Sequence, residues 1–124
     1  MMAEQTKKTL VLGASDNPTR YSYLAVNKLR SKGHPVVAIG NKPGRVADIE
    51  VQTEKKPQDD VDTVTLYLNP ARQEEYYDYI ISLHPRRIIF NPGAENEELE
   101  QLAKKNNIQT MEACTLVLLS TGQF

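Results

Sequence analysis

Thr9–Arg20 reads TLVLGASDNPTR, and this stretch decides the fold. An apolar segment, Thr9–Leu12, is followed by a glycine, a small polar residue, a proline and an arginine, and a helical pattern begins directly afterwards. The order predicts a strand, a tight turn and the start of a helix. Backbone N–H groups at a helix start lack intrahelical partners, and the helix dipole is positive there. The stretch is therefore suited to binding a phosphate group. Arg20 adds a planar guanidinium that suits phosphate oxygens.

Length and composition predict one small domain that binds neither nucleic acid nor a membrane. The chain has 124 residues and a net charge of −1, which argues against a general nucleic-acid surface. The longest apolar run is too short to span a bilayer. Cys114 is the single cysteine, and without a signal-peptide pattern it favours a cytoplasmic protein. We expect Met1–Lys8 to be frayed and residues 9–124 to form the domain.

Short apolar runs recur along the chain and predict about five strands, at Thr9–Leu12, Val36–Ile39, Thr63–Leu68, Arg87–Phe90 and Ile108–Met111. Helical spacing between most of them predicts helices over about 20–32, from Pro70 to Pro85, and over about 95–106. Strands alternating with helices imply right-handed crossovers and a parallel sheet covered on both faces. The fold class is therefore α/β, a single Rossmann-like doubly wound domain with about five parallel strands.

Two segments depart from this alternation. Gly40–Asp62 is polar, and we expect it to wrap over one edge of the sheet with a short strand at Asp48–Val51 and no crossover helix. Met111–Leu119 is ambiguous, and its pattern allows a last helix that starts near Glu112 and packs on the sheet edge.

Ligands of doubly wound sheets bind at the carboxyl ends of the strands. Here these ends lead into four loops, 13–20, 40–45, 69–72 and 91–95, which are rich in small residues, Asn and Pro. The predicted ligand-binding residues lie in these loops: Gly13, Ala14, Ser15, Pro18, Arg20, Asn41, Lys42, Asn69, Pro70, Ala71, Pro92 and Gly93.

The loops favour a phosphorylated nucleotide without fixing which one. The dinucleotide fingerprint G-x-G-x-x-G is incomplete, because only Gly13 is present. After the second strand, Asn41 and Lys42 stand where NAD enzymes often have an acidic residue, and their chemistry suits a 2′- or 3′-phosphate on a ribose. Asn17 or Thr19 is expected to cap the following helix. A strand–turn–helix corner without any ligand is the alternative.

Groups suited to catalysis are few. His34 and His84 fall at the opposite rim of the sheet, where we expect surface roles. Ser15 lacks the G-x-S-x-G context of a nucleophile, and Cys114 has no basic neighbour in sequence. No spacing of His, Cys or carboxylates indicates a metal site. We therefore expect no catalytic residues and no metal.

The ordered motifs of the chain resemble those of small stand-alone CoA-binding proteins. The resemblance covers roughly Lys8–Leu118 and rests on Gly13-Ala14-Ser15, Pro18, Arg20 and Ser22-Tyr23, then Asn41, then Asn91, Gly93 and Asn96-Glu97-Glu98, then Met111 and Cys114. The domain of these proteins is similar to the CoA-binding domain of the succinyl-CoA synthetase α-subunit. The resemblance implies a Rossmann-like fold and coenzyme A, or an acyl-CoA, as the ligand.

The resemblance also implies a role for each loop. The Gly13–Ser15 loop and the helix start would receive the CoA phosphates with help from Arg20, and Asn41 and Lys42 would lie near the adenosine and its 3′-phosphate. The loop Asn69–Ala71 would face the pyrophosphate or pantetheine, beside Pro92 and Gly93. The larger synthetases carry their catalytic histidine on a second domain, so the resemblance implies binding and not catalysis.

Two other functions stay open at the level of sequence. One is a minimal NAD(P)-dependent oxidoreductase or nucleotide-sugar-modifying domain, which the Rossmann-like pattern and Lys42 favour. The other is an interaction domain with a degenerate pocket. A homodimer or a partner enzyme is compatible with an edge strand and an apolar C-terminal segment.

Overall fold

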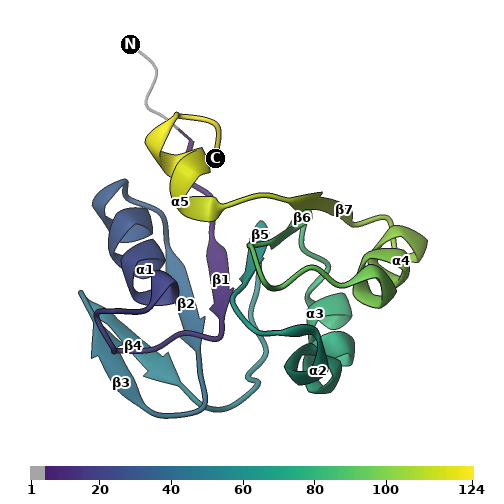
Figure 1. Cartoon of the computed structure of the whole chain (residues 1–124), viewed down its shortest axis with the longest axis horizontal. Helices are drawn as coiled ribbons and strands as arrows, with labels where there is room; N and C mark the ends of the chain where they lie inside the picture. Colours follow the sequence, from purple (N-terminus) through teal and green to yellow (C-terminus); the bar gives the residue numbers. More distant parts are fainter. Residues whose placement is uncertain (1–4) are drawn as a thin grey trace.

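β1 (Thr9–Leu12) lies at the centre of a mostly parallel sheet, as the opening stretch predicts. The computed structural model describes residues 5–124 (Figure 1). All four residues of β1 are buried, and the strand pairs in parallel with β2 (Val36–Ile39) on one side and β5 (Thr63–Leu66) on the other. Burial on both faces is typical of parallel sheets covered by helices. The predicted Rossmann-like α/β fold is confirmed.

The strand count was wrong, because the described residues form seven strands in the order β3-β4-β2-β1-β5-β6-β7. β6 (Arg87–Phe90) and β7 (Gln109–Glu112) complete the parallel side. The extra strands, β3 (Gly44–Val46) and β4 (Ile49–Gln52), form an antiparallel hairpin, and β4 also pairs in parallel with β2. The hairpin turns at Ala47, whose φ is 54°. The short strand expected near 48–51 is β4, and its partner β3 was missed.

The helices lie on both faces of the sheet. α1 (Tyr21–Ser31) and α5 (Thr115–Ser120) cover one face. The other carries α2 (Pro70–Gln73), the 3₁₀ turn η1 (Glu74–Tyr76), α3 (Tyr77–Leu83) and α4 (Glu97–Lys105). The helix predicted from Pro70 to Pro85 is thus broken into three pieces. The last helix that the sequence allows is present as α5, but it begins at Thr115 and not near Glu112, because Glu112 pairs with Phe90 at the end of β7.

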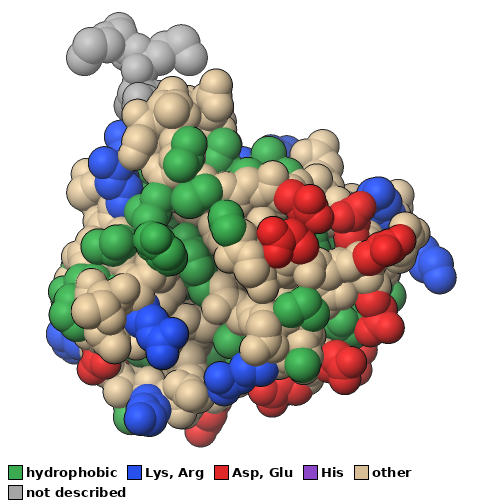
Figure 2. Space-filling view, in the orientation of Figure 1, with side chains coloured by type: hydrophobic (Ala, Val, Ile, Leu, Met, Phe, Trp, Pro, Cys, Tyr) green, Lys and Arg blue, Asp and Glu red, His purple; other side chains and the backbone are tan. Residues whose placement is uncertain are grey.

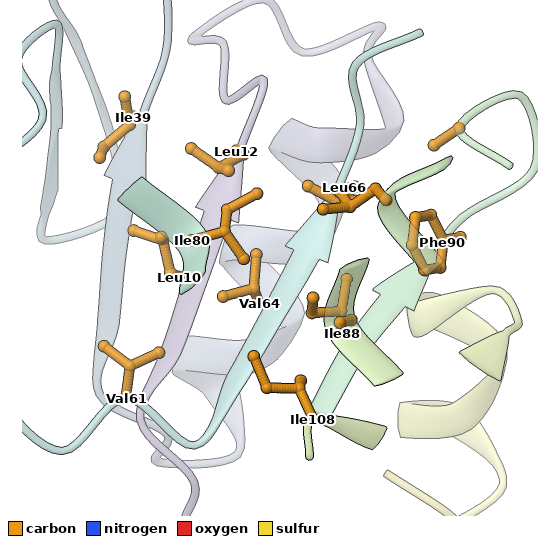
Figure 3. Close-up of a cluster of buried hydrophobic side chains, with 13 residues drawn as sticks. Leu10, Leu12, Ile39, Val61, Val64, Leu66, Ile80, Ile88, Phe90 and Ile108 are labelled. Carbon is orange, nitrogen blue, oxygen red and sulfur yellow. The ribbon is translucent and has the colours of Figure 1, made fainter. Parts of the chain in front are cut away.

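Alternate strand residues fill two separate cores, since successive side chains point to opposite faces. The larger core joins Leu10, Val64 and Ile88 from three neighbouring strands to Ile80 of α3 and Leu99 of α4 (Figure 3). The smaller core joins Val11 and Ala38 to Val26, Leu29 and Leu119 of the two helices on the other face. Both cores hold the strand ends, and so the loops beyond them, in fixed positions.

At the rim opposite the predicted loops, His34 is buried, which contradicts the surface role expected from sequence. Its Nδ1 accepts a hydrogen bond from the backbone N–H of Lys7 at 2.9 Å, and its ring packs edge-on against Phe124 with centroids 5.1 Å apart. His84 is exposed and ends α3 in a left-handed conformation.

The expectation of a frayed start at Met1–Lys8 falls partly outside the described residues, which begin at residue 5. Within them, the backbone N–H groups of Asp62 and Thr63 donate to the carbonyl oxygen of Lys8. Lys7 and Lys8 are therefore attached to the sheet. Among the described helices, none has the length and apolar character needed to cross a membrane.

Candidate functional site

A cleft of about 570 Å³ opens at the carboxyl ends of the central strands. The chain moves from β1 to β2 on one side and later returns to β5 on the other, so strand order reverses here, where ligands bind in such sheets. All four predicted loops contribute to the lining. Of the predicted residues, Gly13, Ala14, Ser15, Arg20, Asn41, Asn69, Pro92 and Gly93 line the cleft. Pro18, Lys42, Pro70 and Ala71 are described residues that lie outside this lining.

The first loop is held tightly against its neighbours. Gly13 has a φ of 86°, and a Cβ there would lie 2.9 Å from the backbone carbonyl group of Tyr67. The N–H groups of Gly13 and Ala14 both donate to the carbonyl oxygen of Ile39, at 2.9 and 3.0 Å. A Cβ on Gly40 would lie 2.1 Å from the carbonyl oxygen of Ala14. These contacts join the loops after β1 and β2 and occupy the N–H groups of Gly13 and Ala14.

The start of α1 has no side-chain cap, so the expected capping by Asn17 or Thr19 is wrong. The Asn17 side chain instead accepts from the N–H and hydroxyl groups of Thr19, and Arg20 becomes the N-cap residue. Within the described chain, the backbone N–H groups of Tyr21 and Ser22 have no hydrogen-bond acceptor. Both residues line the cleft. The open N–H groups of this corner therefore belong to the helix start.

The third and fourth loops are tied together by Gln73, a residue that sequence reasoning missed. Its side chain is fully buried, and Nε2 donates to the carbonyl oxygens of Leu68 and Ala94, both at 2.8 Å. Its Oε1 accepts from Nδ2 of Asn96 at 2.9 Å, and Asn96 also caps α4. Leu68 and Ala94 line the cleft from opposite loops. Gln73 therefore fixes the distance between these two walls.

Other cleft residues outside the predicted set bring further charge and aromatic surface. Arg72 supplies a second guanidinium, and Glu75 a carboxylate whose Oε2 lies 3.9 Å from Nζ of Lys55. Tyr76 lies beneath the same Lys55, whose Nζ is 4.9 Å from the ring centroid. The lining residues missed by the sequence prediction are Thr19, Tyr21, Ser22, Gly40, Tyr67, Leu68, Arg72, Glu75, Tyr76 and Ala94. Most of them lie within the predicted loops or directly beside them, so proximity to these loops in the sequence is the feature that could have identified them.

A buried polar network lies beside the cleft. Asn91 donates from Nδ2 to the hydroxyl of Thr65 at 2.7 Å and accepts from the N–H of Thr115 at 2.9 Å. The two threonine hydroxyls are 2.8 Å apart. The hydroxyl of Tyr67 is buried without a well-oriented partner among the described residues, and burial raises its pKa, with a smaller contribution from the nearby thiol of Cys114. The network connects the loop after β6 to the start of α5.

Metal-ligating side chains do not gather anywhere in the described part of the chain, where no group of three or more His, Cys, Asp or Glu residues could hold an ion. The cleft instead combines open backbone N–H groups, two guanidiniums, amides and aromatic rings. Such a set can bind a phosphorylated ligand with a flat ring system.

Comparison with known proteins agrees with this geometry. A crystal structure of a protein described as uncharacterized shares 49% identity, with a TM-score of 0.94, over 98% of this chain and 100% of the other. The Thermus thermophilus protein ID.343 shares 20% identity, with a TM-score of 0.84, over 96% and 91% of the two chains. A hypothetical protein from Pyrococcus horikoshii OT3 shares 20%, with a TM-score of 0.85, over 94% and 84%. The last two establish likeness of fold.

None of the curated proteins is significantly similar to this chain in sequence. The CoA binding domain family, in contrast, matches residues 7–120, which span all four cleft loops. The chain therefore belongs to the CoA binding domain family.

Proposed function

We propose that this protein binds coenzyme A or an acyl-CoA without catalysing a reaction of its own. The observation that carries the proposal is the joining of two guanidiniums, Arg20 and Arg72, with the open N–H groups of α1 in one cleft. Coenzyme A carries a pyrophosphate and a 3′-phosphate, so it can use both kinds of donor. Membership of the CoA binding domain family supports the same ligand.

The pyrophosphate, the adenosine and the pantetheine arm each have a complementary part of the cleft. The pyrophosphate would lie between the start of α1 and Arg20. The adenosine would lie beside Gly40 and Asn41 after β2, since both residues line the cleft. The pantetheine arm would then pass toward the loops after β5 and β6, past Leu68 and Gly93.

The absence of catalysis is proposed from the chemistry of the lining. Glu75 is the one carboxylate among the described lining residues, and Lys55 lies close to it. His34 and His84 lie at the far rim. Cys114 lies outside the described cleft lining and makes no predicted contribution to binding.

The test is calorimetric titration of the purified chain with CoA, dephospho-CoA and NADP⁺. We expect CoA to bind, dephospho-CoA to bind more weakly because it lacks the 3′-phosphate, and NADP⁺ to bind least. Arg20→Ala should weaken CoA binding by about 1.5–3 kcal/mol, the range for hydrogen bonds to charged groups. Arg86→Ala is the matched control, because Arg86 is exposed beside β6 at the opposite rim.

Two outcomes would overturn the proposal. Tighter binding of NADP⁺ than of CoA would favour the oxidoreductase alternative. Failure of all three ligands to bind would favour an interaction domain whose cleft is not used for nucleotides.

A further inference from the structure

A shallow groove lies on the surface of α4, separate from the cleft. It is lined by Tyr77, Glu97, Glu98, Gln101, Leu102 and Lys105, and none of these residues lines the cleft. Tyr77 and Leu102 are half-buried and pack against the larger core, so their remaining exposed surface forms an apolar floor for the groove. Figure 2 shows acidic and basic side chains close together at the edge of the molecule where α4 lies.

The groove follows one face of α4. Its helical residues Glu98, Gln101, Leu102 and Lys105 are three, one and three residues apart, a spacing that aligns them in one stripe along the helix. We call these four residues the α4 stripe. A carboxylate stands at its start, an ammonium group at its end, and the apolar floor lies between them.

The two charges of the α4 stripe lie too far apart to pair with each other. Glu98 and Lys105 are seven residues apart, which is about 10 Å along a helix. Both are exposed, and neither forms an ion pair within the described residues. Their neighbours Glu100 and Lys104, in contrast, pair with each other at 3.0 Å. The charges at the two ends of the α4 stripe are therefore available to an outside partner.

The α4 stripe is complementary to itself when two copies of the helix lie antiparallel. A two-fold axis midway between Gln101 and Leu102 sets Glu98 of each copy opposite Lys105 of the other. The same axis brings the two Leu102 side chains together at the centre, where each covers the apolar floor of the other groove. A two-fold axis that joins the same patch of both subunits is the commonest symmetry of soluble oligomers.

We propose that the α4 stripe is the interface of a homodimer in which two copies of α4 pack antiparallel. A second copy is the occupant that the charges favour, because it presents the opposite charge at both ends of the α4 stripe at once. The nine residues of α4 span only about 13 Å, so the contact is small and the dimer is weak. This inference is independent of the proposed function, since it needs no ligand in the cleft.

The test is sedimentation equilibrium of the intact chain at about 10 μM to 1 mM, a range suited to a small interface. Glu98→Lys and Lys105→Glu each place like charges opposite one another at both ends of the α4 stripe. Each variant alone should therefore dimerise at least about tenfold more weakly than the unaltered chain. An equimolar mixture of the two variants should form a heterodimer, because opposite charges then face each other at both ends. We expect its affinity to lie within about threefold of that of the unaltered dimer.

Lys32→Glu is the control, because it makes the same change of charge at an exposed helix end. Lys32 caps α1, which covers the other face of the sheet, so this variant should dimerise like the unaltered chain. Thermal unfolding checks that all variants stay folded, as expected for exposed positions. An unaltered chain that stays monomeric at 1 mM would overturn the proposal. A dimer that survives both charge reversals, or a mixture of folded variants that stays monomeric, would overturn it as well.

Discussion

Replacing Gln73 by leucine tests whether one buried amide holds the two walls of the cleft. In Gln73→Leu, the carbonyl oxygens of Leu68 and Ala94 lose their side-chain donor at a fully buried position. Asn96 keeps a partner, since its Nδ2 also donates to the hydroxyl of Tyr77 at 2.8 Å. Each buried acceptor left without a partner costs about 1–3 kcal/mol, so the two carbonyl oxygens together cost about 2–6 kcal/mol. The greater apolar burial of leucine offsets part of this, and we expect a net loss of about 2–4 kcal/mol.

The assay is urea-induced unfolding at pH 7, with the loss taken from the free energy of unfolding. Gln101→Leu is the control, since Gln101 is exposed on α4 and should change stability by less than about 0.5 kcal/mol. In Gln73→Glu, the pKa of the new carboxyl group should be raised by burial and by the two carbonyl oxygens. That variant should therefore lose stability as pH rises above about 4.3, the ordinary pKa of glutamate. A loss below about 1 kcal/mol for Gln73→Leu would refute the reasoning.

Three further changes probe other parts of the molecule. Gly40→Ala should destabilise the fold by about 3 kcal/mol or more, because its Cβ would lie 2.1 Å from a backbone carbonyl oxygen. Gly93→Ala should cost only about 1–2 kcal/mol, because the space around Gly93 is open and only its φ of 93° is unfavourable for alanine. Thermal unfolding of the two variants measures the difference. Tyr67→Phe should change the free energy of unfolding by less than about 1 kcal/mol, since it removes a buried hydroxyl without a well-oriented partner. The carboxyl of Asp48 should titrate below the ordinary range in an NMR pH series, because a hydrogen bond from Arg30 lowers its pKa. The stabilisation from that ion pair is fully present at pH values above the unfolded-state pKa of about 3.9, and it is lost as the pH falls through the lower pKa of Asp48 in the folded state. An ordinary pKa for Asp48 would contradict the ion pair.

The sequence predicts the centre of the sheet well because each central strand is a short, continuous apolar run. Thr9–Leu12 and Val36–Ile39 have the expected bounds. The hairpin partner β3 was missed because Gly44–Val46 is too short and polar to show a period, and it becomes a strand by pairing with β4. The break at η1 was missed for a related reason, since helical spacing continues through it while the backbone tightens for one turn.

Side-chain roles that depend on distant contacts could not be predicted. His34 is buried because Phe124, 90 residues later, packs on its ring, and nothing near His34 in sequence indicates this. Gln73 belongs to a polar helical segment, so the sequence predicts a surface position for it. It is buried because the loops after β5 and β6 pack around its side chain. The cleft loops themselves were predictable, because their position depends only on strand direction. Which residues within each loop line the cleft was predicted only in part.

The walls of the cleft come from four separated segments between Gly13 and Ala94. Ligand binding is therefore coupled to folding of the whole domain. No short piece of the chain contains all four segments, so a ligand of the cleft binds the native state alone. At a free concentration of one hundred times its dissociation constant, such a ligand adds about 2.7 kcal/mol to the free energy of unfolding. For a chain of this size the melting temperature would rise by roughly 10 °C, so a thermal-shift screen of metabolites can find the natural ligand without knowledge of its chemistry.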